Sequence, residues 1–281
     1  MKLSKKLLLV IFLTFITGFV LGGIVHRQSN RSHTLIAAKL FVRNSISDLI
    51  YGNPYDTYGY PTKKIYTHRC DSVEKVKEQI GKVIGVELDI TFYPEQGIFD
   101  TSHDPQPSIR FPLEDFFIEL SKTDFKFWLD FKNLTPDNAL QALNELNRLF
   151  SKYNIDKKRA IVESHNYNNL DIFRNNGFYT SFYCPVNDQR YLQTDDYFEE
   201  YKTQLINAVN SGNVNAVSFP ANYYSLVKKS GVDVDLLTWH LGMNFSRHSL
   251  RYYIRDNLVK TLMNDDKVKG ILAPRSSAFD R

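Results

Sequence analysis

The sequence predicts a TIM-type (β/α)8 barrel preceded by an N-terminal transmembrane helix. Eight strand-like segments alternate with amphipathic helical stretches over most of the chain, and an unbroken apolar run lies near its start. The strand-like segments are residues 63–68, 83–92, 125–132, 159–165, 179–184, 215–220, 235–241 and 269–274. An open doubly wound sheet is the competing fold, but it usually has a glycine-rich phosphate loop after its first strand, and none is present here.

The apolar run covers residues 7–25, close to the roughly 20 residues that a helix needs to cross a bilayer. Residues 1–6 are basic and predict a short cytoplasmic tail, which places the following domain on the periplasmic or extracellular side. Residues 26–62 are expected to form a juxtamembrane helix and linker, and residues 63–281 the barrel. The alternative is that this run is a cleaved signal peptide and that the domain is secreted. In both cases the domain is exported.

The charge balance argues against a nucleic-acid partner. The chain has 35 basic and 31 acidic residues, but its first 35 residues hold five of the basic residues and no acid. The remaining body is therefore close to neutral. Its two cysteines, Cys70 and Cys184, are expected to be free thiols, because sequence cannot show whether they come close enough to bond.

Acidic side chains stand inside two strands that are otherwise apolar. Glu87 and Asp89 are two residues apart and therefore point to the same side of the second strand, and Asp130 ends the third. Active sites of these barrels lie at the carboxyl ends of the strands, and a buried acid needs a partner. A hard cation such as Mg²⁺ or Ca²⁺ would be such a partner. The alternative is that these acids form structural ion pairs with Lys132 or Arg69.

Two histidines flank these acids in sequence. His68 ends the first strand and His103 follows the second, so they are candidates for a general acid and a general base. Each could instead be a strand-end histidine that bonds to the backbone. Trp239 ends a later strand, where it could form a wall for a leaving group or simply pack inside the barrel.

Several short runs, in this order and spacing, resemble the glycerophosphodiester phosphodiesterase family of the phosphatidylinositol-phospholipase-C-like superfamily. They are THRC (67–70), GVELDITF (85–92), PEQG (94–97), SHDP (102–105), LDFK (129–132), LLTWHL (236–241) and VKGILAPRS (268–276). The chain is also similar to the menorin-type relatives in that superfamily.

The resemblance implies a role for each matching residue. A divalent ion, Mg²⁺ or Ca²⁺, would be bound by Glu87, Asp89 and Asp130; His68 and His103 would be the acid and base; Arg69 and Lys132 would contact phosphate. The chain departs from the family at Cys70, where glycine is usual, and at Asp130, where glutamate is usual.

The expected function is therefore a metal-dependent phosphodiesterase acting on a glycerophosphodiester-like substrate or on a lipid or polymer head group. Its expected partners are this substrate and the membrane that holds the single-pass anchor, with no nucleic acid. One alternative is a non-catalytic barrel that binds a phosphorylated glycan or lipid at the cell surface. A weaker one is a glycoside-processing barrel that uses paired carboxylates without metal.

Overall fold

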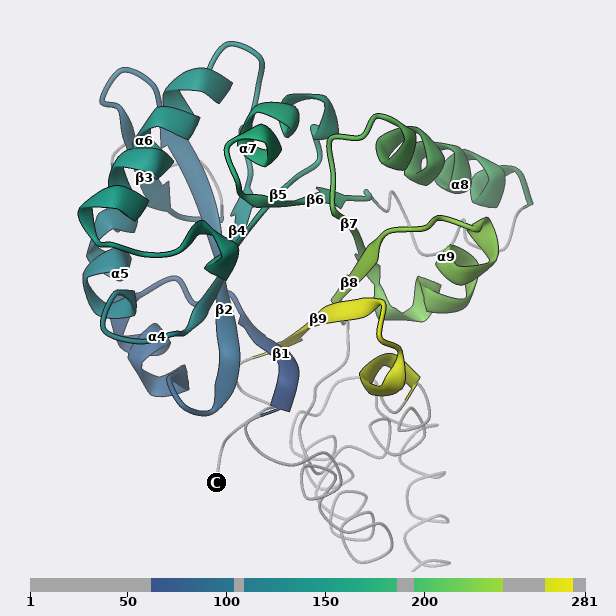
Figure 1. Ribbon diagram of the computed structural model, residues 1–281, viewed down its shortest axis with the longest axis horizontal. Coiled ribbons are helices and arrows are strands. Elements are labelled where there is room, and N and C mark those ends of the chain that lie inside the picture. The colour runs from purple at the N-terminus through teal and green to yellow at the C-terminus, as the bar shows by residue number, and fades with distance from the viewer. Residues whose placement is uncertain (1–61, 104–108, 186–194, 240–260, 275–281) are drawn as a thin grey trace, which may run out of the picture.

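The computed structural model describes residues 62–103, 109–185, 195–239 and 261–274. Eight parallel strands close into a barrel because β1 pairs with both β2 and β9 (Figure 1). The strands are β1 (Thr62–His68), β2 (Val83–Tyr93), β4 (Lys126–Phe131), β5 (Ala160–Ser164), β6 (Tyr179–Tyr183), β7 (Ala216–Pro220), β8 (Asp235–Trp239) and β9 (Val268–Pro274). The predicted barrel and all eight of its strands are confirmed.

A ninth strand, β3 (Ile98–Thr101), was not predicted. It runs antiparallel to the end of β2, with Thr101 opposite Ile90. The turn between the two strands contains Gly97 at φ 65°, a left-handed conformation that glycine adopts without steric cost. The sequence showed this turn but not the short strand after it.

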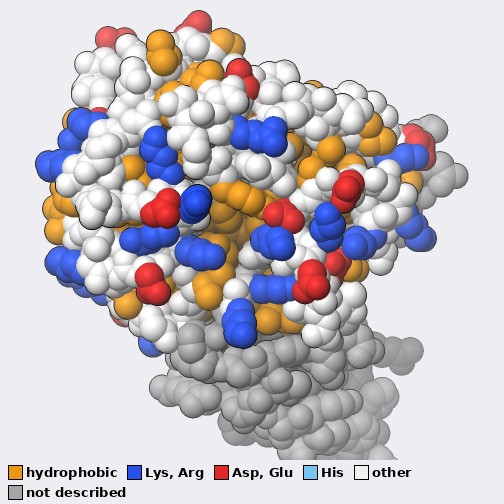
Figure 2. Space-filling view, in the orientation of Figure 1, with side chains coloured by type: hydrophobic (Ala, Val, Ile, Leu, Met, Phe, Trp, Pro, Cys, Tyr) orange, Lys and Arg blue, Asp and Glu red, His pale blue; other side chains and the backbone are white. Residues whose placement is uncertain are grey.

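Helices surround the barrel, as expected from their amphipathic sequences (Figure 1). They are α4 (Val73–Gln79), α5 (Leu113–Leu120), α6 (Ala139–Lys152), α7 (Asp171–Asn175), α8 (Asp195–Asn210) and α9 (Tyr224–Ser230). In α6, the buried side chains of Leu143, Leu146 and Phe150 recur at helical spacing. Viewed along the barrel, hydrophobic side chains lie at its centre and Lys and Arg side chains lie around them (Figure 2).

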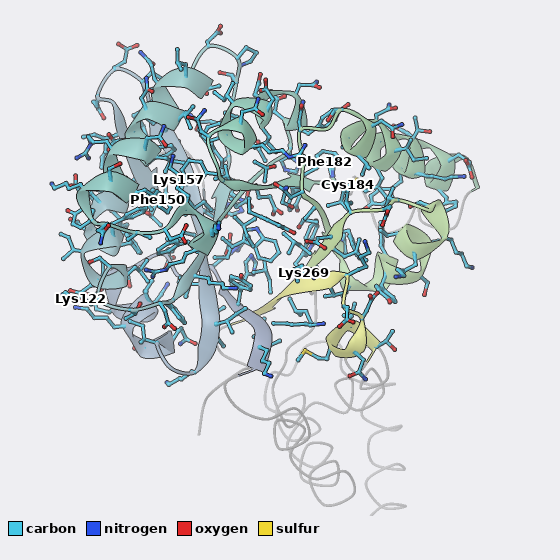
Figure 3. All side chains as sticks on the ribbon, viewed as in Figure 1. Lys122, Phe150, Lys157, Phe182, Cys184 and Lys269 are labelled. Carbon is cyan, nitrogen blue, oxygen red and sulfur yellow. The ribbon has the colours of Figure 1, made fainter. Side chains whose placement is uncertain are left out.

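Two hydrophobic cores hold the fold together. The outer core packs strands against helices, and in it Phe117 of α5 stacks on Phe127 of β4 at 5.5 Å between ring centroids. The inner core fills the barrel with side chains from most of its strands (Figure 3): Tyr66, Trp128, Ile161, Ala216, Leu237, Trp239 and Leu272. A barrel interior filled in this way is a solid support for side chains at its two ends.

The predicted cytoplasmic tail, anchor and linker lie outside the described residues. In the part of the chain that the structure describes, no helix is both long and apolar enough to cross a bilayer. Cys70 and Cys184 are both buried, and no disulfide joins them, as expected.

Candidate active site

Three carboxylates meet at the carboxyl ends of neighbouring strands. Glu87 and Asp89 come from β2, and Asp130 comes from β4, where it is the register partner of Asp89. One oxygen from each lies within 4.8 Å of the others. The three side chains are almost fully buried, at 1%, 5% and 7% exposure. The predicted convergence of these three acids is therefore present in the fold.

The acids disfavour one another's ionisation. Burial raises the pKa of Glu87 well above its ordinary value, and the charges of Asp89 and Asp130 raise it further. Burial also raises the pKa of Asp130. Burial opposes ionisation of Asp89 too, but the adjacent Lys132 ammonium outweighs it and lowers the pKa of Asp89. Buried carboxylates that repel in this way suit a site for a cation with oxygen ligands.

Lys132, which directly follows β4, is the cation that the chain itself supplies. Its Nζ lies 2.6 Å from Asp89 Oδ1 and 2.5 Å from Asp130 Oδ2. Burial disfavours the charged form of Lys132, but the two carboxylates outweigh burial and raise its pKa. The alternative predicted from the sequence, an ion pair between Lys132 and the acids of the second strand, is thus present at Asp89. The same ammonium group also pairs with Asp130.

The end of β1 brings His68 to the same place. Its Nε2 lies 3.8 Å from Glu87 Oε2, and a third of its side chain is exposed. Burial, followed by the charge of Arg69, lowers the pKa of His68 to about 4. The imidazole is therefore neutral near pH 7, which is the form that can accept a proton.

Arg69 contacts the acids through its backbone. It has φ 56°, an uncommon conformation for a residue with a side chain, and its N–H donates to Glu87 Oε2 at 2.6 Å. Among the described residues its exposed guanidinium has no ion-pair partner, so the alternative ion pair for Arg69 is absent. Backbone strain of this kind concentrates at functional sites.

His103 lies just after β3, and its charge acts on both His68 and Asp89. Asp100 of β3 accepts hydrogen bonds from the N–H groups of Arg110 and Phe111, at 2.9 and 2.7 Å. The structure thus gathers His68, His103 and the three acids at one end of the barrel.

An aromatic group lies at the same end. Trp239 is 4% exposed and stacks on Tyr183, with 4.3 Å between centroids and 4° between planes. Burial and the charge of Asp130 raise the pKa of Tyr183, so its hydroxyl lies within electrostatic reach of the acids. Tyr183 was not predicted from the sequence, because Tyr residues are frequent in this chain and strands commonly carry them.

Glu163 on β5 was also missed. It is the register partner of Asp130, is 1% exposed, and accepts a hydrogen bond from Ser181 at 2.8 Å. Burial, followed by the charge of Asp130, raises its pKa to about 8. Glu163 lies inside the apolar run AIVES. An acid within an apolar strand is the signal that identified Glu87 and Asp89, and it could have identified Glu163 as well.

No protein-family model matches the chain, and no curated protein sequence matches it. Its structure is similar to three structures assigned as glycerophosphodiester phosphodiesterases. The one from Agrobacterium tumefaciens has a TM-score of 0.53 and 12% identity, covering 77% of this chain and 95% of that one. The one from Galdieria sulphuraria has a TM-score of 0.51 and 12% identity, covering 78% and 96%.

The third, from Parabacteroides distasonis, has a TM-score of 0.50 and 13% identity, covering 77% of this chain and 94% of that one. Identities this low bear on the fold and leave the chemistry to be argued from the residues themselves. These comparisons show that the chain has the barrel fold of these glycerophosphodiester phosphodiesterases, which is the fold that the resemblance of its short sequence runs implied.

Proposed function

We propose that this protein is a metal-dependent phosphodiesterase that acts on a glycerophosphodiester-like substrate or on a lipid or polymer head group. The observation that carries the proposal is the convergence of three buried carboxylates beside His68 at the carboxyl end of the barrel. This is the end at which barrels of this kind do their chemistry. The similarity in fold to glycerophosphodiester phosphodiesterases supports the same substrate class.

Glu87, Asp89 and Asp130 would hold the divalent ion, Mg²⁺ or Ca²⁺. Their oxygens are of the type that both ions prefer, and their mutual repulsion favours a bound cation. When bound, the ion would offset the negative charge of the phosphodiester. Lys132 would add a second positive charge beside the phosphate, since its Nζ already lies against two of the proposed ligands.

His68 and His103 would move the protons. His68 is neutral near pH 7 and can accept a proton from the attacking hydroxyl, either of water or of the substrate itself. His103 would then donate a proton to the leaving oxygen. Arg69 would contact the phosphate through its exposed guanidinium, and Trp239 would help to form a wall for the leaving group.

We further propose that residues 7–25 anchor the protein, so that the barrel acts on the outer side of a membrane. A cleaved signal, with a secreted barrel, is the alternative. The substrate would then be drawn from exported or surface-exposed phosphodiesters.

The double ion pair of Lys132 favours a second candidate, a non-catalytic barrel that binds a phosphorylated glycan or lipid. Turnover separates the two. The full chain in detergent would be assayed on bis(p-nitrophenyl) phosphate with Mg²⁺, Ca²⁺, Mn²⁺ or chelator, beside a Glu87→Gln variant purified identically. Ion-dependent release of nitrophenol by the wild type alone supports the enzyme; no release with any ion favours the binding protein.

A further inference from the structure

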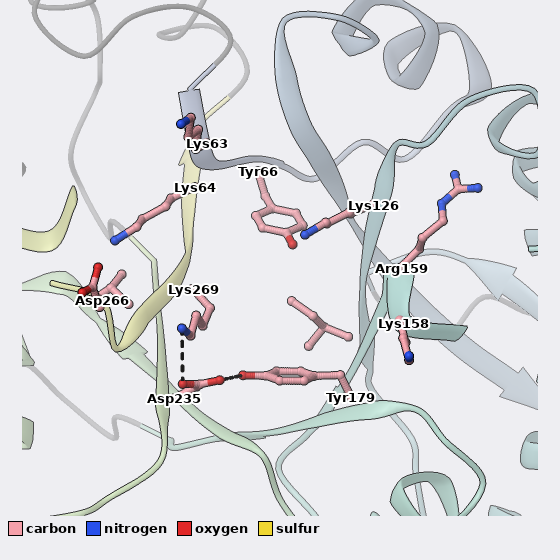
Figure 4. Close-up of a pocket in the computed structure, with 12 residues that line it drawn as sticks. Lys63, Lys64, Tyr66, Lys126, Lys158, Arg159, Tyr179, Asp235, Asp266 and Lys269 are labelled. Atoms are coloured by element: carbon pink, nitrogen blue, oxygen red, sulfur yellow. Dashed lines mark hydrogen bonds and ion pairs between the residues drawn. The ribbon is translucent and has the colours of Figure 1, made fainter. Parts of the chain in front are cut away.

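A concave region lies at the end of the barrel opposite the carboxylates, where the strands begin. It is a pocket of about 550 Å³, within the size range of small-molecule sites (Figure 4). Strand β4 spans the distance between the two ends: Lys126 begins it at the pocket, and Asp130 follows four residues later. At about 3.3 Å per residue, their Cα atoms are about 13 Å apart.

The pocket is strongly basic. Six cationic side chains line it: Lys63, Lys64, Lys126, Lys158, Arg159 and Lys269. Two carboxylates, Asp235 and Asp266, also line it, which leaves an excess of four positive charges. Lys and Arg side chains gathered around a hydrophobic hollow are visible on the face drawn in Figure 2. A concave surface with one sign of charge attracts ligands of the opposite sign.

Half of these cations already have partners. Lys64 donates to the carbonyl of Asp265 at 2.8 Å, Arg159 donates to the carbonyl of Phe125 at 2.6 Å, and Lys269 lies 3.8 Å from Asp235.

The other half are available to a ligand. Lys63, Lys126 and Lys158 are exposed, and among the described residues none of their ammonium groups forms an ion pair. In Figure 4, Lys126 extends into the pocket near Tyr66, whereas Lys269 is directed to Asp235.

Tyr66 forms the floor of the pocket and offers it a hydrogen-bond donor. Its side chain is 3% exposed and its ring meets Trp128 edge-on at 5.6 Å. Its hydroxyl has no hydrogen-bond partner among the described residues, and Figure 4 shows it directed into the pocket. A Cβ on Gly85 would lie 2.7 Å from Tyr66 Cε1, so glycine is required there for the ring to take this position. The hydroxyl opens onto the pocket, so a ligand oxygen bound there can accept a hydrogen bond from it.

We propose that this pocket binds an anion carrying two or more phosphate groups, at a site separate from the catalytic end. Several ammonium groups from different strands suit a ligand with several charges, and the Tyr66 hydroxyl donates the hydrogen bond that fixes one phosphate oxygen. The ligand is either a soluble phosphorylated molecule or a set of anionic lipid head groups. The second source is relevant because β1 begins at Thr62, immediately after the linker from the predicted anchor.

The test uses the full chain in nanodiscs of phosphatidylcholine and inorganic pyrophosphate as the probe. Chelator is present throughout, so that a divalent ion at the carboxylates does not contribute. Calorimetry would compare the wild type with the double variant Lys126→Gln/Lys158→Gln. We expect about tenfold weaker binding for each charge removed, because a charge-assisted contact is worth on the order of 1.4 kcal/mol.

The matched control is Lys122→Gln/Lys229→Gln, which removes the same charge from exposed positions outside the pocket. Weaker binding by the pocket variant alone supports the site. Equal binding by wild type and both variants, or no binding by the wild type, overturns it.

A second arm repeats the titration in nanodiscs that contain phosphatidylglycerol. A larger loss of pyrophosphate affinity by the wild type than by the pocket variant identifies lipid head groups as the competing ligand, and an equal change in both identifies a soluble one. Neither arm depends on turnover, so failure of the proposed phosphodiesterase activity leaves this result interpretable.

Discussion

Replacing Asp89 with Asn tests whether the three carboxylates form a metal site or a structural ion-pair cluster. The substitution keeps the shape of the side chain and removes one charge next to Glu87 and Lys132. In the metal site, it replaces a charged ligand with a neutral one and so weakens binding of the ion. In the ion-pair cluster, it leaves Lys132 with one partner fewer, whatever ion is present.

The expected size follows from mass action. A wild-type site at an ion concentration 100 times Kd gains about 2.7 kcal/mol, and a variant with about 100-fold weaker affinity gains about 0.4 kcal/mol. The difference of about 2.3 kcal/mol corresponds to a Tm difference of about 5–9 °C for a barrel of this size. Without ion, Asp89→Asn should change the stability little. Lys132 keeps its ion pair with Asp130 at 2.5 Å, and Glu87 loses a neighbouring charge that repels it.

The assay is thermal unfolding of the full chain in detergent, with Mg²⁺, Ca²⁺, Mn²⁺ or chelator. Glu163→Gln is the matched control, since it replaces a buried acid one strand away from Asp130 that is outside the set of three. It should keep the full response to the ion. A wild-type Tm that no divalent ion changes would refute the metal site. A loss of about 3 kcal/mol or more in Asp89→Asn under chelator would instead indicate a structural ion pair.

Three other outcomes are expected. His68→Ala and His103→Ala should each lower the rate of phosphodiester cleavage by about 10²-fold with little change in Tm, because each removes an acid or a base. Near-normal rates in both variants would show that these histidines are not the acid and base. Burial raises the pKa of Glu163 from 4.5 to about 8, so its contribution to stability is complete below pH 4.5 and is lost as the pH rises through 8. Denaturant unfolding between pH 5 and 9 should therefore show the wild type losing stability relative to Glu163→Gln, and parallel curves would contradict the assignment. The full chain should fractionate with membranes and resist salt extraction because of residues 7–25, while protease added outside intact cells should cleave the barrel; complete protection would reverse the proposed topology.

The fold was predictable because its signals are local. Each buried parallel strand reads as a short apolar run, and each intervening helix shows its own periodicity, as in the spacing of Leu143, Leu146 and Phe150. The strand β3 was not predictable in this way. Its four residues pair only with the end of β2, and so short a segment has no periodicity of its own.

Which residues share a strand face follows from the order of residues alone, because side chains alternate along a strand whatever surrounds them. This alternation groups Glu87 with Asp89 and Asp130 with Lys132. Which of these faces meet depends on the three-dimensional fold. The register between β2 and β4 sets Asp89 beside Asp130, and the course of the Lys132 side chain brings its ammonium group between them. Strand register depends on the closure of the whole barrel, so no local pattern in the sequence contains it.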